Sequence, residues 1–143
     1  MYLIGIPLLL IPFAVYNIIE FLIPAAAPGA FWDQTVTSVG LASGARWIMT
    51  AGDLLIAFSL LILFVEILKS ARLSSRSIID HLLSMVLFVV MLIEFLLVPQ
   101  AASGTFFLLM VICFVDVVSG FSVSIRTAQR DIAFDGANTI HHP

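Results

Sequence analysis

The chain has 143 residues, of which 62% are hydrophobic and 10% are charged, and its formal net charge is -3. Soluble domains carry about 45–50% apolar and about 25% charged residues, and a chain this small cannot bury so much apolar surface in one water-soluble core. These values exclude a soluble domain and a disordered chain, and the lack of excess positive charge excludes a nucleic-acid-binding module. We therefore expect an integral membrane protein.

Four apolar runs are long enough to cross a bilayer core, which takes roughly 20 residues of helix. They cover about residues 2–23, 47–68, 79–98 and 105–125. Helices are expected because lipid cannot satisfy open strand edges and the runs lack the alternating pattern of barrel strands. The sequence thus predicts an all-α membrane protein, a four-transmembrane-helix bundle forming one domain over residues 1–135, with a flexible cytoplasmic tail at 136–143.

The first run has two features that need separate treatment. Pro7 and Pro12 lie inside it and are expected to bend the helix, because each removes a helical hydrogen bond. The small residues at 25–27 also resemble a signal-peptide cleavage site. No Lys or Arg precedes the run, however, the run is too long, and Glu20 lies just before the cut, so we expect it to be retained as a span.

The distribution of basic residues predicts the orientation. One side of the membrane would carry Lys69, Arg72, Arg76, Arg126 and Arg130, and the other would carry Arg46 alone. Positive charge favours the cytoplasmic side, which places the 69–79 loop and the C-terminus there. With four spans the N-terminus is cytoplasmic too, and the segment 24–46, with its Trp and Phe residues, lies at the outer interface.

The first and third runs end alike. Ile19-Glu20-Phe21-Leu22 recurs as Ile93-Glu94-Phe95-Leu96, and Phe64-Val65-Glu66 in the second run is echoed by Phe114-Val115-Asp116 in the fourth. Two parallel helix-hairpin repeats would explain this order and would place Glu20 and Glu94 at one depth. The alternative is chance, since Leu, Ile and Phe dominate the chain, and both explanations remain open at this stage.

Acidic residues inside apolar runs require an explanation, because each costs about 2.5–3.5 kcal/mol on insertion scales. Glu20, Asp53 and Glu94 are all expected in the outer half of the membrane, with Arg46 as a possible ion-pair partner. One hypothesis is a carboxylate cluster that binds a proton or cation. The other is a structural role, with the acids paired to Arg46, protonated or hydrogen-bonded to neighbours.

Asp116 lies near the middle of the fourth run, on a stripe of small residues at helical spacing, formed with Cys113, Gly120 and Ser124. Small residues permit close approach of helices, and a polar group among them can hydrogen-bond across the contact. A packing seam is the favoured interpretation, and a position in a proton relay is the alternative.

Two further polar groups have simple explanations. Glu66 is three residues before Lys69, and a pair that extends toward the membrane surface accounts for both. His81 is a lone histidine at the start of the third run, whereas metal sites need three or four protein ligands, so neither a metal nor another cofactor is expected. The single Cys113 likewise excludes a disulfide within the chain.

Four stretches of the second half of the chain form a recognisable pattern: Ile79-Asp80-His81, Ile93-Glu94-Phe95-Leu96-Leu97-Val98-Pro99-Gln100, Thr105-Phe106-Phe107-Leu108-Leu109 and Val115-Asp116-Val117. On these stretches, most of the chain from about Trp47 onward resembles small four-span inner-membrane proteins of bacteria, a group without an assigned activity. The resemblance implies the bacterial cytoplasmic membrane and four spans. It implies no activity and transfers no functional residue.

Two functions follow as hypotheses. The first is a non-enzymatic structural, accessory or assembly protein that associates with a second copy or with another membrane protein, because little mass lies outside the apolar runs and no nucleophile, metal or phosphate-binding motif occurs. The second is a small proton- or cation-coupled transporter that uses the four acids Glu20, Asp53, Glu94 and Asp116.

Overall fold

The computed structural model of the chain describes residues 5–71 and 77–139, and this part is mostly helical. Its elements are the helices α1 (Leu10–Leu22), α2 (Ala51–Ala71), α3 (Ser77–Leu97), the short 3-10 helix η1 (Pro99–Ala101) and α4 (Gly104–Thr139), with the strands β1 (Thr35–Gly40) and β2 (Arg46–Thr50). Three stretches are long and apolar enough to cross a membrane, namely Ala51–Ala71, Ile78–Leu97 and Gly104–Ser122, and α1 is a shorter apolar helix. The expected helical, membrane-type architecture is therefore confirmed in outline.

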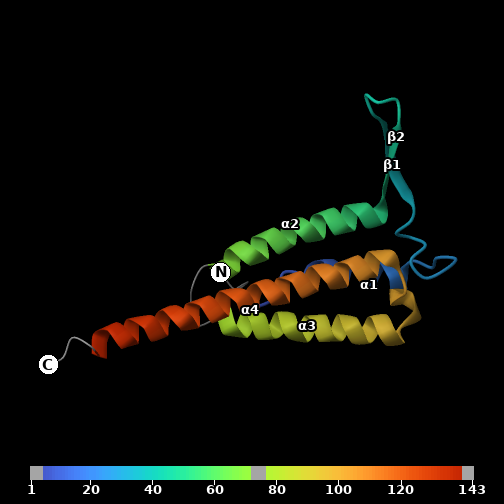
Figure 1. The fold of residues 1–143 in the computed structure, drawn as a ribbon. Coiled ribbons are helices and arrows are strands. Elements are labelled where there is room, and N and C mark those ends of the chain that lie inside the picture. Colours follow the sequence, from blue (N-terminus) through green and yellow to red (C-terminus); the bar gives the residue numbers. More distant parts are fainter. Residues whose placement is uncertain (1–4, 72–76, 140–143) are drawn as a thin grey trace.

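The helix α4 is the centre of the bundle. It packs along both α2 and α3, and α1 lies behind it in the view of Figure 1. The core residues come from all four helices, and include Tyr16, Leu55, Met91 and Phe106. On the outside the helices expose large apolar side chains such as Leu61, at 68% of its surface, and Leu97, at 75%. An apolar core surrounded by an apolar exterior suits lipid rather than water.

A β-hairpin that the sequence analysis did not predict precedes α2. β1 and β2 pair antiparallel, with Val39 opposite Trp47, and the hairpin projects away from the helices in Figure 1. Thr, Val, Ile and Trp favour extended backbone, and Gly44, at φ 85, supplies the left-handed residue in the turn. Consequently the second helix begins at Ala51, and the expected start of the second span at residue 47 is wrong.

The first helix is also shorter than expected. α1 has 13 residues and begins at Leu10, so it covers about 20 Å rather than a full bilayer core. Pro7 precedes the helix, and Pro12 lies in its first turn, where the N–H has no helical partner in any case. The expectation of a bend inside a long first helix is therefore wrong. The prolines instead delay its start, and residues 5–9 form turns.

The last helix continues far beyond the apolar bundle. α4 has 36 residues, or about 54 Å at the usual rise, and its apolar stretch ends at Ser122. We call residues 123–139 the α4 stalk, because this part extends alone past the end of α2 and the start of α3 (Figure 1). The stalk includes residues 136–139 of the segment expected to be a flexible tail, and residues 140–143 lie outside the described part.

Candidate functional site

Two ends of the bundle carry its polar groups. At the hairpin end lie the end of α1, the β-hairpin and η1, whereas at the stalk end lie the end of α2, the start of α3 and the segment 5–9 (Figure 1). Among the side chains that the structure describes, four polar ones are buried within the helices, and they are Ser59, Glu66, Ser84 and Asp116. Buried polar groups are hydrogen-bonded or paired in native proteins, so their partners indicate what each does.

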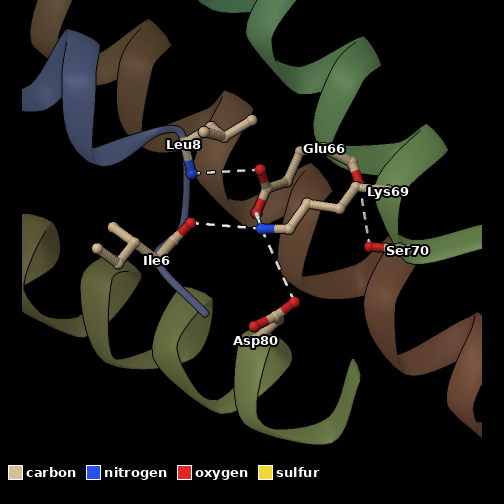
Figure 2. Close-up of polar contacts among 6 residues, drawn as sticks. All are labelled: Ile6, Leu8, Glu66, Lys69, Ser70 and Asp80. Carbon is tan, nitrogen blue, oxygen red and sulfur yellow. Dashed lines mark hydrogen bonds and ion pairs between the residues drawn. The ribbon is translucent and has the colours of Figure 1, made fainter. Parts of the chain in front are cut away.

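Glu66 holds the start of the first helix in place. Its side chain is only 3% exposed, and its Oε2 accepts a hydrogen bond of 3.2 Å from the backbone N–H of Leu8 (Figure 2). Leu8 lies in the turns before α1, where backbone donors lack a helical partner. Glu66 of α2 thus accepts a hydrogen bond from a backbone N–H of the non-helical segment 5–9, which has no helical acceptor of its own.

Lys69 joins three parts of the chain at the same point. Its Nζ is 3.8 Å from Glu66 Oε1 and 3.7 Å from Asp80 Oδ2, and it donates a 3.4 Å hydrogen bond to the carbonyl oxygen of Ile6 (Figure 2). We call Glu66, Lys69 and Asp80 the polar clamp. The polar clamp ties α2, α3 and the segment 5–9 together at the stalk end. Within it the ammonium group of Lys69 lies between the carboxylates of Glu66 and Asp80 and partly neutralises both charges.

Only part of this arrangement is predictable from the sequence. The spacing of Glu66 and Lys69 predicts their ion pair, which the structure confirms. No local pattern identifies Asp80 as the second partner of Lys69, or Leu8 as the residue whose N–H Glu66 accepts, because these lie on other segments. One sequence signal points to the bond between Glu66 and Leu8, and it is Pro7. A proline near the start of an apolar run leaves neighbouring backbone groups without a helical hydrogen-bond partner, and an acid elsewhere in the bundle can accept from them.

Asp116 belongs to α4 and lies in the core, where α4 packs against α3. Its side chain is 4% exposed, and its polar neighbours include Ser84, His81 and Lys69. A Cβ added at Gly120 would contact the ring of His81. The small-residue stripe of α4 therefore packs against α3 of the same chain.

Cys113 and Ser124 complete the account of that stripe. Cys113 is 1% exposed, and its thiol lies 3.8 Å from the carbonyl oxygen of Ser84, which it approaches as a weak donor. Ser124 belongs to α4, but its side chain lies outside the described part. The role of the stripe shown by its described members is close packing within the bundle.

The three acids expected in the outer half do lie at the hairpin end, but each has its own partners. Glu20 accepts hydrogen bonds from the N–H of Gly29 at 2.7 Å and from Trp32 Nε1 at 3.1 Å. Glu94 accepts one from Asn17 Nδ2 at 3.3 Å. Two hydrogen bonds thus account for Glu20, whereas only one oxygen of Glu94 has a partner and its Oε1 is buried without one. No hydrogen bond joins the two acids directly in the described part of the chain.

Asp53 has a local structural role. Its Oδ2 accepts the N–H of Thr50 at 2.9 Å, and its own N–H donates to Thr50 Oγ1 at 3.1 Å, which is a capping box at the start of α2. Arg46 is exposed on β2, and within residues 5–71 and 77–139 the ion pairs involve Lys69 rather than Arg46. The ion pair expected for Arg46 is not present there.

Tyr16 organises the hairpin end between these acids. Its ring is fully buried, stacks on Trp32 at 5.0 Å and meets the edge of Phe106 at 5.0 Å. Its hydroxyl donates to the carbonyl oxygen of Gln100 at 2.9 Å and lies 2.7 Å from Ser103 Oγ. The aromatic contacts fix the loop 24–34 against α1 and α4, and the hydrogen bond from the hydroxyl to Gln100 fixes η1 against α1.

The described residues include no group of three His, Cys, Asp or Glu side chains that could hold a metal ion. Comparison of the chain with protein-family models, with curated proteins and with solved structures finds no match. The arguments for function therefore rest on two features of this chain, the buried polar groups of the bundle and the α4 stalk that leaves it.

Proposed function

We propose that the chain is a non-enzymatic accessory or assembly protein of a bacterial cytoplasmic membrane. In this proposal it crosses the bilayer four times, with the stalk end in the cytoplasm. Residues 5–22 would make the first crossing, with α1 supplying about 20 Å and the turns before it the rest. The orientation is supported by Lys69, which lies near the stalk end of the stretch Ala51–Ala71, and by Arg126 and Arg130, which lie beyond the stretch Gly104–Ser122.

The observation that carries this proposal is the α4 stalk. Its side chains Ile125, Ile132 and Phe134 are 58%, 72% and 71% exposed. Ile125, Ala128 and Ile132 follow one another at helical spacing, so they form an apolar stripe on one face. Most helical stability in proteins comes from packing of such an apolar face, and this face is exposed in the chain by itself. A partner that covers the stripe would supply the missing contacts, and it would be a second copy or another membrane protein.

The test is purification of the tagged full chain from its native membranes in mild detergent, with mass spectrometry of the proteins that accompany it. We expect a stoichiometric companion, or a dimer, that is lost in the double variant Ile125→Gln/Ile132→Gln. The matched control is Arg130→Gln, which changes an exposed stalk residue on roughly the opposite face from Ile132. A companion retained by the double variant, or lost equally in the control, contradicts the proposal.

A second candidate function is proton-coupled transport. The observation that favours it is the burial of Glu66 and Asp116, at 3% and 4% exposed, near His81 and the polar clamp. Acids inside a membrane bundle mark proton paths in many transporters. Of the acids at the hairpin end that the sequence suggests for this role with Asp116, Glu20 and Asp53 have hydrogen-bond partners nearby in the chain, and Glu94 has a partner on one oxygen only.

Proteoliposomes distinguish the two candidates. Vesicles loaded with a pH-sensitive dye and clamped by potassium and valinomycin report proton movement directly. Transport predicts a proton flux that is abolished in Glu66→Gln and in Asp116→Asn but retained in Asp53→Asn, which alters a cap outside this group. No flux above that of empty vesicles leaves the accessory function as the better account.

A further inference from the structure

A small cavity opens at the hairpin end, apart from the polar clamp and the stalk. It has a volume of ≈ 280 Å³ and is lined by Glu20, Gln100 and the segment 24–28. This segment is the exposed loop directly after α1, and Gln100 belongs to η1. Glu20 therefore lies where the end of α1, the loop and η1 meet, and it faces a space that a ligand can enter.

The carboxylate of Glu20 is held in a fixed position. Gly29 donates its N–H to one oxygen at 2.7 Å, and the indole of Trp32 donates to the other at 3.1 Å. Trp32 is itself only 3% exposed and stacks on Tyr16, so the donor cannot easily move. Two hydrogen bonds leave capacity unused, because a carboxylate has about four acceptor positions.

Among the described residues the carboxylate of Glu20 has no cationic partner, because the ion pairs there are those of Lys69 at the other end of the bundle. Pro24 and Pro28, which line the cavity, have no N–H and so add no backbone donor beside Glu20. A carboxylate with a surplus of acceptors selects a positively charged donor.

The size and the remaining walls indicate an organic cation. A water molecule takes about 30 Å³ of liquid, so the cavity has room for several non-hydrogen atoms and is larger than a bare ion needs. Ala25, Ala26 and Ala27 also line it, and their short apolar side chains are compatible with a short hydrocarbon chain. Gln100 is the remaining lining residue, and a glutamine side chain can both accept and donate a hydrogen bond.

We propose that this cavity is a binding site for a small primary amine, with its ammonium group on Glu20 and its hydrocarbon part against the alanines of the loop. The site is independent of the accessory function proposed above. It lies on the side of the bundle away from the stalk, so it would bind a ligand that approaches from the opposite side of the membrane.

The indole N–H of Trp32 is a direct reporter of the site, because it already donates to Glu20. The experiment is a two-dimensional NMR titration of the full chain, labelled with 15N-tryptophan in neutral nanodiscs, with n-butylammonium chloride as the probe. The chain has two tryptophans. We expect a saturable shift of the Trp32 indole signal, while the signal of Trp47, which lies on the hairpin, stays in place.

Three variants test the assignment. Glu20→Gln keeps an acceptor for Trp32 but removes the charge, and should weaken the apparent affinity about tenfold or more. Ala26→Leu fills the cavity and should abolish the shift while leaving Glu20 intact. Glu94→Gln is the control, because it removes a carboxylate at the same end of the bundle that does not line the cavity. This variant should bind butylammonium with the same affinity as the parent chain.

Sodium chloride at the same ionic strength is the control for screening. The proposal is overturned if butylammonium produces no saturable shift, or if sodium produces the same one. It is also overturned if Glu20→Gln or Ala26→Leu binds the amine as tightly as the parent chain does. The purification experiment tests binding of a partner to the α4 stalk and has no bearing on this site. The accessory function and the amine site can therefore be refuted independently.

Discussion

The contact between Gly120 and His81 gives the sharpest prediction about stability. A Cβ built at Gly120 would lie 2.6 Å from Cε1 and 2.8 Å from Cγ of the His81 ring, and real Cβ contacts essentially never fall under 3.0 Å. The ring would have to retreat by about 1 Å in a close-packed interior. His81 Nε2 is buried, so the ring has little free space on that side.

We expect Gly120→Ala to destabilise the bundle. Overpacking of a core costs about 1–3 kcal/mol, and the replacement of glycine by alanine in a helix returns about 0.5–1 kcal/mol. The net loss therefore lies between about 0 and 2.5 kcal/mol, with a central value of about 1 kcal/mol. Gly136→Ala is the matched control on the same helix, because a Cβ there meets nothing within 4 Å, and this variant should be slightly more stable than the parent chain.

The assay is reversible unfolding in mixed micelles of a neutral detergent and dodecyl sulfate, followed by far-ultraviolet circular dichroism. A double-mutant cycle with His81→Ala should show a coupling free energy of about 0.5–3 kcal/mol with Gly120→Ala. The reasoning is refuted if Gly120→Ala unfolds at the same detergent fraction as Gly136→Ala. It is also refuted if removal of the imidazole does not relieve the loss.

Three further variants test other contacts. Glu66→Leu should lower the free energy of unfolding by about 1–3 kcal/mol, because the buried N–H of Leu8 loses its acceptor. Hydrogen exchange at that N–H should become faster, and unchanged exchange would contradict the polar clamp. Asp53→Ala should cost about 0.5–1 kcal/mol in the same unfolding assay, since it removes an exposed cap of α2. Tyr16→Phe should cost about 1–3 kcal/mol, because Ser103 and a backbone carbonyl lose the buried hydroxyl, and equal stability would show that these bonds contribute nothing.

The three long helices were predictable because an apolar run of about 20 residues has one stable form in lipid. The starts of α1 and α2 were not. Trp47–Met49 is as apolar as the helix that follows, so hydropathy merged strand and helix into one run, although the β-branched and aromatic residues of 35–50 favour extended backbone. Likewise, the delayed start of α1 follows from Pro7 and Pro12, which composition alone cannot place relative to a helix boundary.

The candidate sites were predictable only where partners are close in sequence. The pair Glu66–Lys69 is separated by one helical turn, so spacing alone identifies it. The bond from Leu8 to Glu66 joins residues 58 positions apart, and local patterns carry no information about it. Glu20 was correctly singled out as an acid that needs an explanation, but its partner Trp32 and the cavity beside it depend on how the loop 24–34 folds back onto α1.

The continuity of α4 has a mechanical consequence. From Gly104 to Thr139 the chain contains no proline, and all 36 residues belong to one helix. A continuous helix transmits rotation and axial displacement along its length, whereas a loop would absorb them. A force applied at the far end of the stalk would therefore reach Ser103 and the aromatic cluster around Tyr16, some 50 Å away by the usual helical rise, without an intervening hinge.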